Sequence, residues 1–301
     1  MKKLLGIAAV AWVPVLGWAC ACGCGMFDVR TRSMFPAGEG GLAFVEYNYA
    51  DQNHNWSGQS RAPAADNSDK DIRTEFYTAG AQYMFDREWG IIAQVPYWNR
   101  TFTTVDELGH SVSFTHGALG DARIRGIYSG FSPDMSSGCT FGLKLPTGDY
   151  TYRHFDRDTE IGTGSTDILL GAYRMGMLPI GSRWYGFING QLDLPALTAD
   201  GYDPGSEIGA VAGVYYNGWR AGHAKIAPVA QAIATHRWCD HGAAGDPENT
   251  GYDRVLLSPG VEVDRGNASL YADVAFPVYQ DVKGNQLAAS ALLTFRMSFS
   301  F

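Results

Sequence analysis

Hydrophobic and polar residues alternate along most of the chain after residue 41, which is the pattern of β-strands with two unlike faces. The last segment shows this most clearly, because Phe295 and Met297 fall on one face while Arg296 and Ser298 fall on the other. The alternation predicts twelve strands, near residues 42–50, 71–85, 89–102, 119–131, 138–147, 166–177, 183–196, 207–218, 224–238, 252–264, 268–280 and 287–301.

The connections between these segments differ in length in a regular way. Those after strands 1, 3, 5, 7 and 9 are long and polar, at 51–70, 103–118, 148–165, 197–206 and 239–251, whereas those after strands 2, 4, 6, 8 and 10 are short. Bacterial outer-membrane barrels have short periplasmic turns and longer outer loops. The pattern therefore predicts one all-β, antiparallel transmembrane barrel of about 12 strands at 42–301, with both termini in the periplasm.

Two soluble β-sandwich domains would also show alternating strands. The predicted strands are nearly twice the ~5 to 6 residues common in soluble proteins, and no linker divides the chain after residue 41. Tryptophans stand at strand ends, as in the aromatic girdles of membrane barrels; they are Trp89, Trp98, Trp184, Trp219 and Trp238. These features favour the barrel.

The first 19 residues have the layout of a secretory signal peptide, with Lys2 and Lys3 before an apolar stretch and small residues around Ala19. A membrane anchor is the alternative, but the stretch is shorter than the ~20 apolar residues that a bilayer requires. Cleavage after Ala19 would leave a short periplasmic segment at 20–41, and lipid attachment at Cys20 is a further alternative. We expect the protein in the bacterial outer membrane.

The chain carries 31 acidic and 23 basic residues, for a formal net charge of −8. Nucleic-acid binding is disfavoured, because it requires clustered positive charge. The 37 glycines and the aromatic content of 13% suit a sheet protein with tight turns.

Three motifs resemble a known family of outer-membrane barrels. They are the runs at 117–123 (GALGDAR), 143–149 (LKLPTGD) and 161–171 (IGTGSTDILLG). They are similar to the family called MetA-pathway of phenol degradation proteins, whose members are also called transporters. The resemblance implies a barrel in the outer membrane and a path for small solutes, with aromatic compounds as one candidate class. The terminal Phe301 is similar to the signal that the barrel-assembly machinery binds, which makes that machinery an expected partner beside outer-membrane lipid.

The polar face of the predicted strands is expected to line the lumen. Its residues are Glu46, Arg73, Glu75, Gln94, Asp121, Arg123, Arg125, Lys144, Gln191, Asp193, Lys225, Gln231, Glu262, Asp273 and Arg296. Both charge signs are present, so the lumen is either a narrow polar pore or a barrel plugged by ion pairs. Twelve strands are intermediate between filled eight-stranded barrels and open channels of 16 to 18 strands.

A metal site is the alternative function. Cys20, Cys22 and Cys24 lie two residues apart, and thiolates suit soft ions such as copper or zinc. His236, Cys239 and His241 form a second candidate for a soft ion. Asp156, Asp158 and Glu160 form a candidate for a hard cation.

The sequence favours a channel that passes small solutes, and it predicts neither a resident cofactor nor an enzyme, because no nucleophile and base can be placed together. A plugged structural or binding barrel and a metal-handling protein remain open.

Overall fold

The computed structural model describes residues 35, 36 and 38–301, in which antiparallel β-strands account for almost all regular structure. The elements are β1 (Gly40–Gly58), β2 (Ser60–Arg61), a short 3-10 helix η2 (Ala64–Asp66), β3 (Asp71–Met84), β4 (Trp89–Val105), β5 (Ser111–Leu119), β6 (Ala122–Tyr128), β7 (Ser137–Leu145), β8 (Thr166–Met177), β9 (Trp184–Leu197), β10 (Glu207–Tyr216), β11 (Trp219–Ala221), β12 (Ala224–Arg237), β13 (Tyr252–Arg265) and β14 (Ala268–Ser300). No helix among the described residues is long and apolar enough to cross a membrane.

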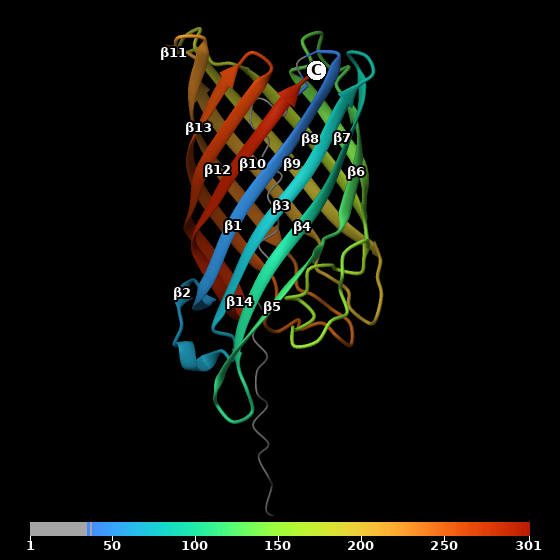
Figure 1. The fold of residues 1–301 in the computed structure, drawn as a ribbon, viewed down its shortest axis with the longest axis vertical. Helices are drawn as coiled ribbons and strands as arrows, with labels where there is room; N and C mark the ends of the chain where they lie inside the picture. The colour runs from blue at the N-terminus through green and yellow to red at the C-terminus, as the bar shows by residue number, and fades with distance from the viewer. Residues whose placement is uncertain (1–34, 37) are drawn as a thin grey trace, which may run out of the picture.

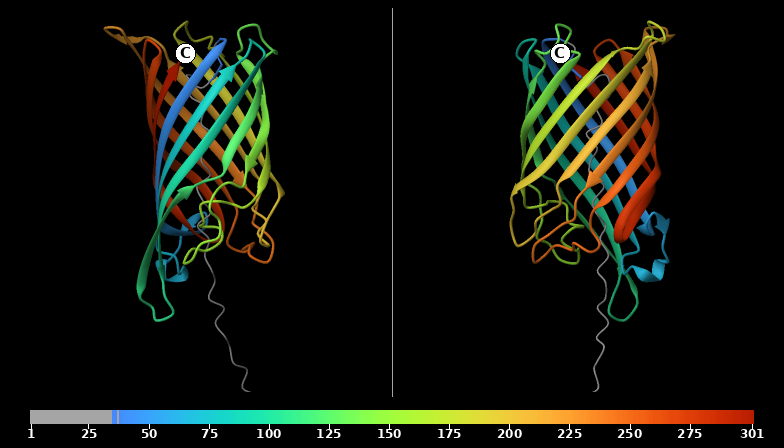
Figure 2. Two further views of the ribbon diagram at one scale, coloured as in Figure 1. Left: turned by 45° about the vertical axis from the view of Figure 1, so that its right-hand side comes forward. Right: turned by 180° about the vertical axis from the view of Figure 1, so that it is seen from behind.

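The strands form a closed barrel in which each strand pairs with its neighbours in the chain. The order is β10-β9-β8-β7-β6-β4-β3-β1-β14-β13-β12, and β10 also pairs with β12, which closes the ring. β1 and β14 join the two ends of the chain, with Leu42 opposite Ser300. Figures 1 and 2 show the tilted strands wrapping around a single axis. The fold predicted from the sequence, an antiparallel barrel of the outer-membrane type, is therefore present.

The long element β14 crosses the barrel twice. Its residues 268–282 pair with β13, and its residues 282–300 pair with β1. The two arms are joined at the long-loop end, near Gly284, which has a φ of 66°. At the short-turn end, the Ser300 N–H donates to the carbonyl of Asn267, just before β14, at 2.9 Å. The ring thus holds eleven labelled strands in the described part of the chain, and twelve crossings if the arms of β14 are counted separately.

Short turns and long loops lie at opposite ends of the barrel. In Figure 1 the C-terminus and the short turns are at the top, and the long loops are at the bottom. Two predicted loops are partly strand instead. β1 runs to Gly58, because Asn55 and Trp56 still pair with β14. The loop expected at 103–118 is a β-hairpin, because β4 continues to Val105 and pairs with β5.

Side chains alternate between the lumen and the outer surface along each strand. On β3 the buried Thr74 and Phe76 alternate with the exposed Arg73 and Tyr77. Large apolar residues cover much of the outer surface, among them Val45, Val95, Leu143, Ile168, Ile188, Leu257, Leu270, Phe276, Phe295, Met297 and Phe299. An apolar exterior around a closed strand ring is the arrangement that lets strands cross a bilayer.

Candidate functional site in the barrel lumen

Aromatic and aliphatic side chains fill the half of the lumen nearer the short turns. The cluster consists of Phe35, Tyr173, Phe187, Val211, Tyr215, Val229, Ile233, Leu256, Tyr271 and Ala275. The Tyr185 and Tyr215 rings are stacked at 5.3 Å. The Phe187 ring lies over Gly213 of the neighbouring β10, where a β-carbon would not fit. We call this set the aromatic layer.

Phe35 is the member of the aromatic layer that precedes the first strand. Its side chain is only 3% exposed, and its ring centroid lies 5.1 Å from that of Tyr173 and 5.8 Å from that of Phe187. Because Tyr173 and Phe187 point inward from β8 and β9, Phe35 lies inside the barrel. A residue that is not part of the wall therefore occupies the lumen.

A second apolar cluster covers the opposite wall near the short turns. It consists of Leu42, Phe44, Met84, Ile92, Ile127 and Met135, and the Phe44 ring lies against Gly80 of β3. The two clusters make much of the short-turn half of the lumen apolar, although Arg125, Lys225 and Glu262 also face inward there. The prediction of a polar lumen thus holds for only part of its length.

Glu46 and Arg296 form a buried ion pair between β1 and β14. Arg296 Nε donates to Glu46 Oε2 at 2.6 Å, and Arg296 Nη2 contacts the same oxygen. The Arg296 guanidinium also lies 5.9 Å from the centre of the Tyr271 ring in the aromatic layer. Pairing allows both charges to remain inside the barrel, since a single buried charge is costly.

Two further networks hold the predicted lumen residues. Arg125, which is 2% exposed, donates from Nη1 to Gln191 Oε1 at 2.7 Å and from Nη2 to Gln94 Oε1. Gln231 Nε2 donates to Tyr271 Oη at 2.9 Å and to Asp273 Oδ2 at 3.0 Å. Both networks tie inward-facing side chains of different strands together.

Two further inward-facing charges, those of Lys144 and Asp121, lie toward the long loops. Lys144 of β7 pairs with Asp167 of β8. Asp121 lies between β5 and β6, and its carboxylate accepts hydrogen bonds from the Gly148 N–H at 3.0 Å and the Thr163 N–H at 2.9 Å. Asp121 therefore anchors the β7–β8 loop. Four other predicted residues, Arg123, Asp193, Lys225 and Glu262, are also on the inward positions of their strands.

Arg73 is not a lumen residue. The structure places it on the outer face of β3, exposed, between the buried Ile72 and Thr74. Its register partners are Asp51 and Thr101, so this outer face is polar near the long loops. Glu75 has the same outward orientation. The prediction failed here because the outer surface is polar at the long-loop end of the strand, so polarity does not identify the inner face.

The β7–β8 loop, residues 146–165, packs across the long-loop end of the barrel. Phe155 contacts Phe102 of β4, with ring centroids 5.5 Å apart. On the other side, the Arg157 guanidinium lies 4.4 Å from the centre of the Tyr202 ring in the β9–β10 loop. We call this loop the lid.

Carboxyl groups of the lid and of two neighbouring loops lie near one another. Asp69, which precedes β3, is 1% exposed and accepts a hydrogen bond from Thr104 Oγ1 at 3.0 Å. Burial, together with the charges of Asp156 and Asp158, raises its pKa to about 8. Burial also raises the pKa of Asp156 to about 6, with a contribution from Asp246 of the β12–β13 loop.

The candidate metal ligands are not brought together. His236 Nδ1 lies 2.7 Å from Asp253 Oδ1, Cys239 Sγ accepts a hydrogen bond from Lys283 Nζ at 3.4 Å, and His241 pairs through its backbone with Asp203. Across residues 35, 36 and 38–301, no group of three or more His, Cys, Asp or Glu side chains is placed to hold a metal ion.

Among the described residues, Asp156, Asp158 and Glu160 do not form a cation site either. Glu160 Oε2 forms an ion pair with Arg157 Nη1 at 3.1 Å. Cys20, Cys22 and Cys24 lie outside the described residues.

The sequence prediction missed the aromatic layer. The sequence analysis assigned neither Tyr173 nor Phe187 to a face, although Tyr173 shares strand parity with Asp167 and Phe187 shares it with Gln191. That shared parity was the available signal.

Comparison with solved structures supports the fold. The chain is similar to the COG4313 outer membrane channel from Pseudomonas putida F1, with a TM-score of 0.67, 13% identity and coverage of 91% of this chain and 100% of that one. It is also similar to the β domain of the Bordetella autotransporter BrkA, with a TM-score of 0.53, 14% identity and coverage of 87% and 100%.

The sequence comparisons add no family assignment. No family model matches the chain, and no curated protein matches it. The resemblance to MetA-pathway of phenol degradation proteins therefore stays a prediction, and the structures show a shared outer-membrane barrel fold.

Proposed function

We propose that this protein is an outer-membrane channel for small hydrophobic or aromatic compounds. The observation that carries this proposal is the aromatic layer around Phe35, which spans the lumen between β8, β9 and β14. Moving an ion into apolar surroundings is costly, whereas an apolar solute gains roughly 0.8 kcal/mol for each buried CH₂ group. The layer thus favours apolar solutes over ions.

The polar networks fit the same role. Glu46 and Arg296 pair with each other and Lys144 pairs with Asp167, which compensates these charges, while Arg125 and Asp273 are held by hydrogen bonds to neutral side chains. We assign no catalytic residue, because passive transport requires none. Substrates with an apolar body and a small polar group would contact both kinds of surface.

The orientation and the partners belong to this proposal. We infer a barrel of twelve crossings whose short turns and termini face the periplasm, since short periplasmic turns are typical of such barrels. The strand that ends at Phe301 would bind the barrel-assembly machinery, and the apolar exterior would contact outer-membrane lipid. We expect no nucleic-acid partner, given the net charge of −8.

A closed binding barrel is the second candidate, and Phe35 favours it, because this residue occupies the lumen. The two candidates differ in transport. A closed barrel passes neither ions nor apolar solutes, whereas a hydrophobic channel passes apolar solutes while its ion conductance stays low.

The test compares two probes in cells that express the protein. The entry of N-phenylnaphthylamine, an apolar aromatic dye, should be several-fold faster than in cells with an empty vector. The entry of nitrocefin, a hydrophilic compound, should not change. Equal dye entry in both strains contradicts the channel and supports the closed barrel, while faster entry of both compounds indicates a general pore.

Channel function calls for no resident cofactor. Bound copper or zinc at Cys20, Cys22 and Cys24 remains a separate prediction. It is tested by the metal content of the purified protein beside a Cys22→Ser, Cys24→Ser variant, and equal content in the two preparations would contradict it.

A further inference from the structure

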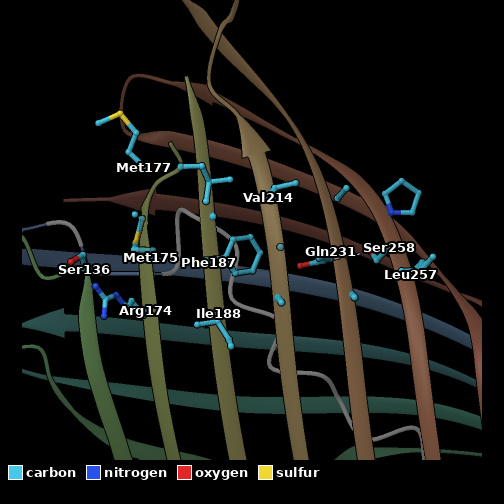
Figure 3. Close-up of a pocket in the computed structure, with 18 of the residues that line it drawn as sticks. Ser136, Arg174, Met175, Met177, Phe187, Ile188, Val214, Gln231, Leu257 and Ser258 are labelled. Carbon is cyan, nitrogen blue, oxygen red and sulfur yellow. Dashed lines mark hydrogen bonds between the residues drawn. The ribbon is translucent and has the colours of Figure 1, made fainter. Parts of the chain in front are cut away.

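The outer face of β8–β13 carries a groove of about 1000 Å³. β9, β10, β12 and β13 each contribute three consecutive residues, 186–188, 212–214, 230–232 and 257–259. In each triplet the middle residue points into the lumen and its two neighbours point outward. The groove is therefore on the outer surface of the barrel and not in the lumen, and Figure 3 shows its lining residues along the five strands.

Strand register explains the groove. One row of outward positions runs through Arg174, Ile188, Ala212, Ala232 and Leu257, each opposite the next on the adjacent strand. The parallel row, toward the short turns, is Gly176, Gly186, Val214, Ala230 and Pro259. Ala212 and Ala232 of the first row and Gly186 and Ala230 of the second form a floor of small residues, and larger side chains such as Ile188, Val214 and Leu257 border it.

The groove has the length and direction of a lipid tail. Four gaps between neighbouring strands give a span of about 19 Å, against about 15 Å for one leaflet of the hydrocarbon core. Arg174 lies close to Met177 at the short-turn end of β8, whereas Leu257 lies further from Arg265 at the corresponding end of β13. The groove therefore rises from the short-turn end toward the middle of the barrel.

One end of the groove is charged with both signs. Arg174 and Asp134 both line it. The Met175 N–H donates to the Ser136 carbonyl at 2.8 Å, which holds the β6–β7 turn beside Arg174. No ion pair joins Arg174 or Asp134 to another residue in the described part of the chain. Asp134 Oδ1 accepts a hydrogen bond from the Ser136 N–H at 3.1 Å, and the nearby Arg87 donates to the Pro133 carbonyl.

We propose that this groove binds one phosphatidylethanolamine molecule, with an acyl chain along the small-residue floor, the phosphate at Arg174 and the primary ammonium at Asp134. A zwitterionic headgroup matches the paired charges, whereas an anionic phosphatidylglycerol would meet the Asp134 carboxylate without a compensating ammonium. A quaternary ammonium, as in phosphatidylcholine, has no N–H to donate. The periplasmic leaflet as the source follows from the orientation proposed above, but binding itself does not depend on transport.

The test is native mass spectrometry of the delipidated full-length protein in detergent, with dioleoyl phosphatidylethanolamine, phosphatidylglycerol or phosphatidylcholine added. We expect one phosphatidylethanolamine to be retained, at least about fivefold better than the other two lipids, since one typical net hydrogen bond has about this effect on an equilibrium. Arg174→Gln and Asp134→Asn should each reduce retention about fivefold. Ala212→Phe should remove most of it, because the ring fills the floor.

Matched controls separate the groove from general lipid contact. Arg220→Gln removes an exposed arginine from β11 at the same end of the barrel, and Ala93→Phe adds a ring to an outward position on β4. Both should retain the lipid. Equal retention of all three lipids, or equal loss in groove and control variants, would overturn the proposal. Heat-modifiable migration on a gel checks that each variant is folded.

Discussion

The two halves of the lumen differ in the kinds of side chain at their inward-facing positions. Near the short turns, many inward side chains are apolar and form two clusters, one of them around Phe35, although Arg125, Lys225 and Glu262 also face inward there. Toward the long loops, charged pairs such as Lys144 with Asp167 lie beside a smaller apolar cluster of Ile72, Phe102 and Leu287, and the lid above them carries the partly buried Asp156. A barrel wall therefore allows two kinds of interior surface, and in the channel proposed above the apolar clusters would restrict ions.

The largest expected effect comes from breaking the ion pair that borders the two halves. Arg296→Met leaves the carboxylate of Glu46 buried without its cation, which should lower the free energy of unfolding by about 3–5 kcal/mol. Urea unfolding in lipid vesicles measures this. Arg296→Lys keeps the positive charge, so its free energy of unfolding should fall by less. Equal stability of Arg296→Met and the parent would show that the pair contributes nothing.

Phe35→Ala tests whether the apolar half closes the lumen. Removing a buried phenyl ring costs about 3–5 kcal/mol of packing free energy, so the segment at residue 35 should no longer stay packed between Tyr173 and Phe187. Ion conductance in planar bilayers should rise several-fold. Phe295→Ala, on the outer face, is the control and should leave the conductance unchanged. Unchanged conductance in Phe35→Ala would mean that the wall residues alone form the barrier.

The lid should respond to pH through Asp69. Its pKa in the folded protein, about 8, is above the ordinary value of 3.8, because burial and the charges of Asp156 and Asp158 disfavour the carboxylate. The contribution of protonated Asp69 to the stability of the folded lid is therefore complete below about pH 3.8 and is lost as the pH rises through about 8. Hydrogen exchange of residues 148–165, expressed as protection factors, should show protection falling over that range.

Asp69→Asn keeps a neutral side chain at every pH and should weaken this dependence between pH 7 and 8. Asp66→Asn, in the exposed helix η2, should retain the parent profile. If the Asp69→Asn and parent profiles coincide, another group controls the lid.

The smallest effect is expected at Arg73. Because Arg73 is exposed on the outer face, Arg73→Gln should change the free energy of unfolding by less than about 0.5 kcal/mol and leave the ion selectivity unchanged. Arg125→Gln removes a lumen charge with two glutamine partners and should shift the reversal potential in a salt gradient. A shift in Arg73→Gln would place this residue on the ion path.

The periodicity of the sequence was enough to predict the barrel and most strand positions, because a closed sheet between lipid and lumen imposes a two-residue repeat. It also predicted the inward orientation of Glu46, Arg125, Asp273 and Arg296. It failed for Arg73, since polarity distinguishes the two faces only within the depth of the membrane.

The alternation of the chain by itself determined that its strands have an inner and an outer face, and the loop lengths determined which strand ends lie together. The tertiary structure decided what occupies the interior. Phe35 reaches Tyr173 and Phe187 only because barrel closure surrounds them, and Asp69 approaches Asp156 only because the lid folds inward. Such contacts join residues far apart in the chain. Their energies depend on burial, which no local sequence pattern indicates.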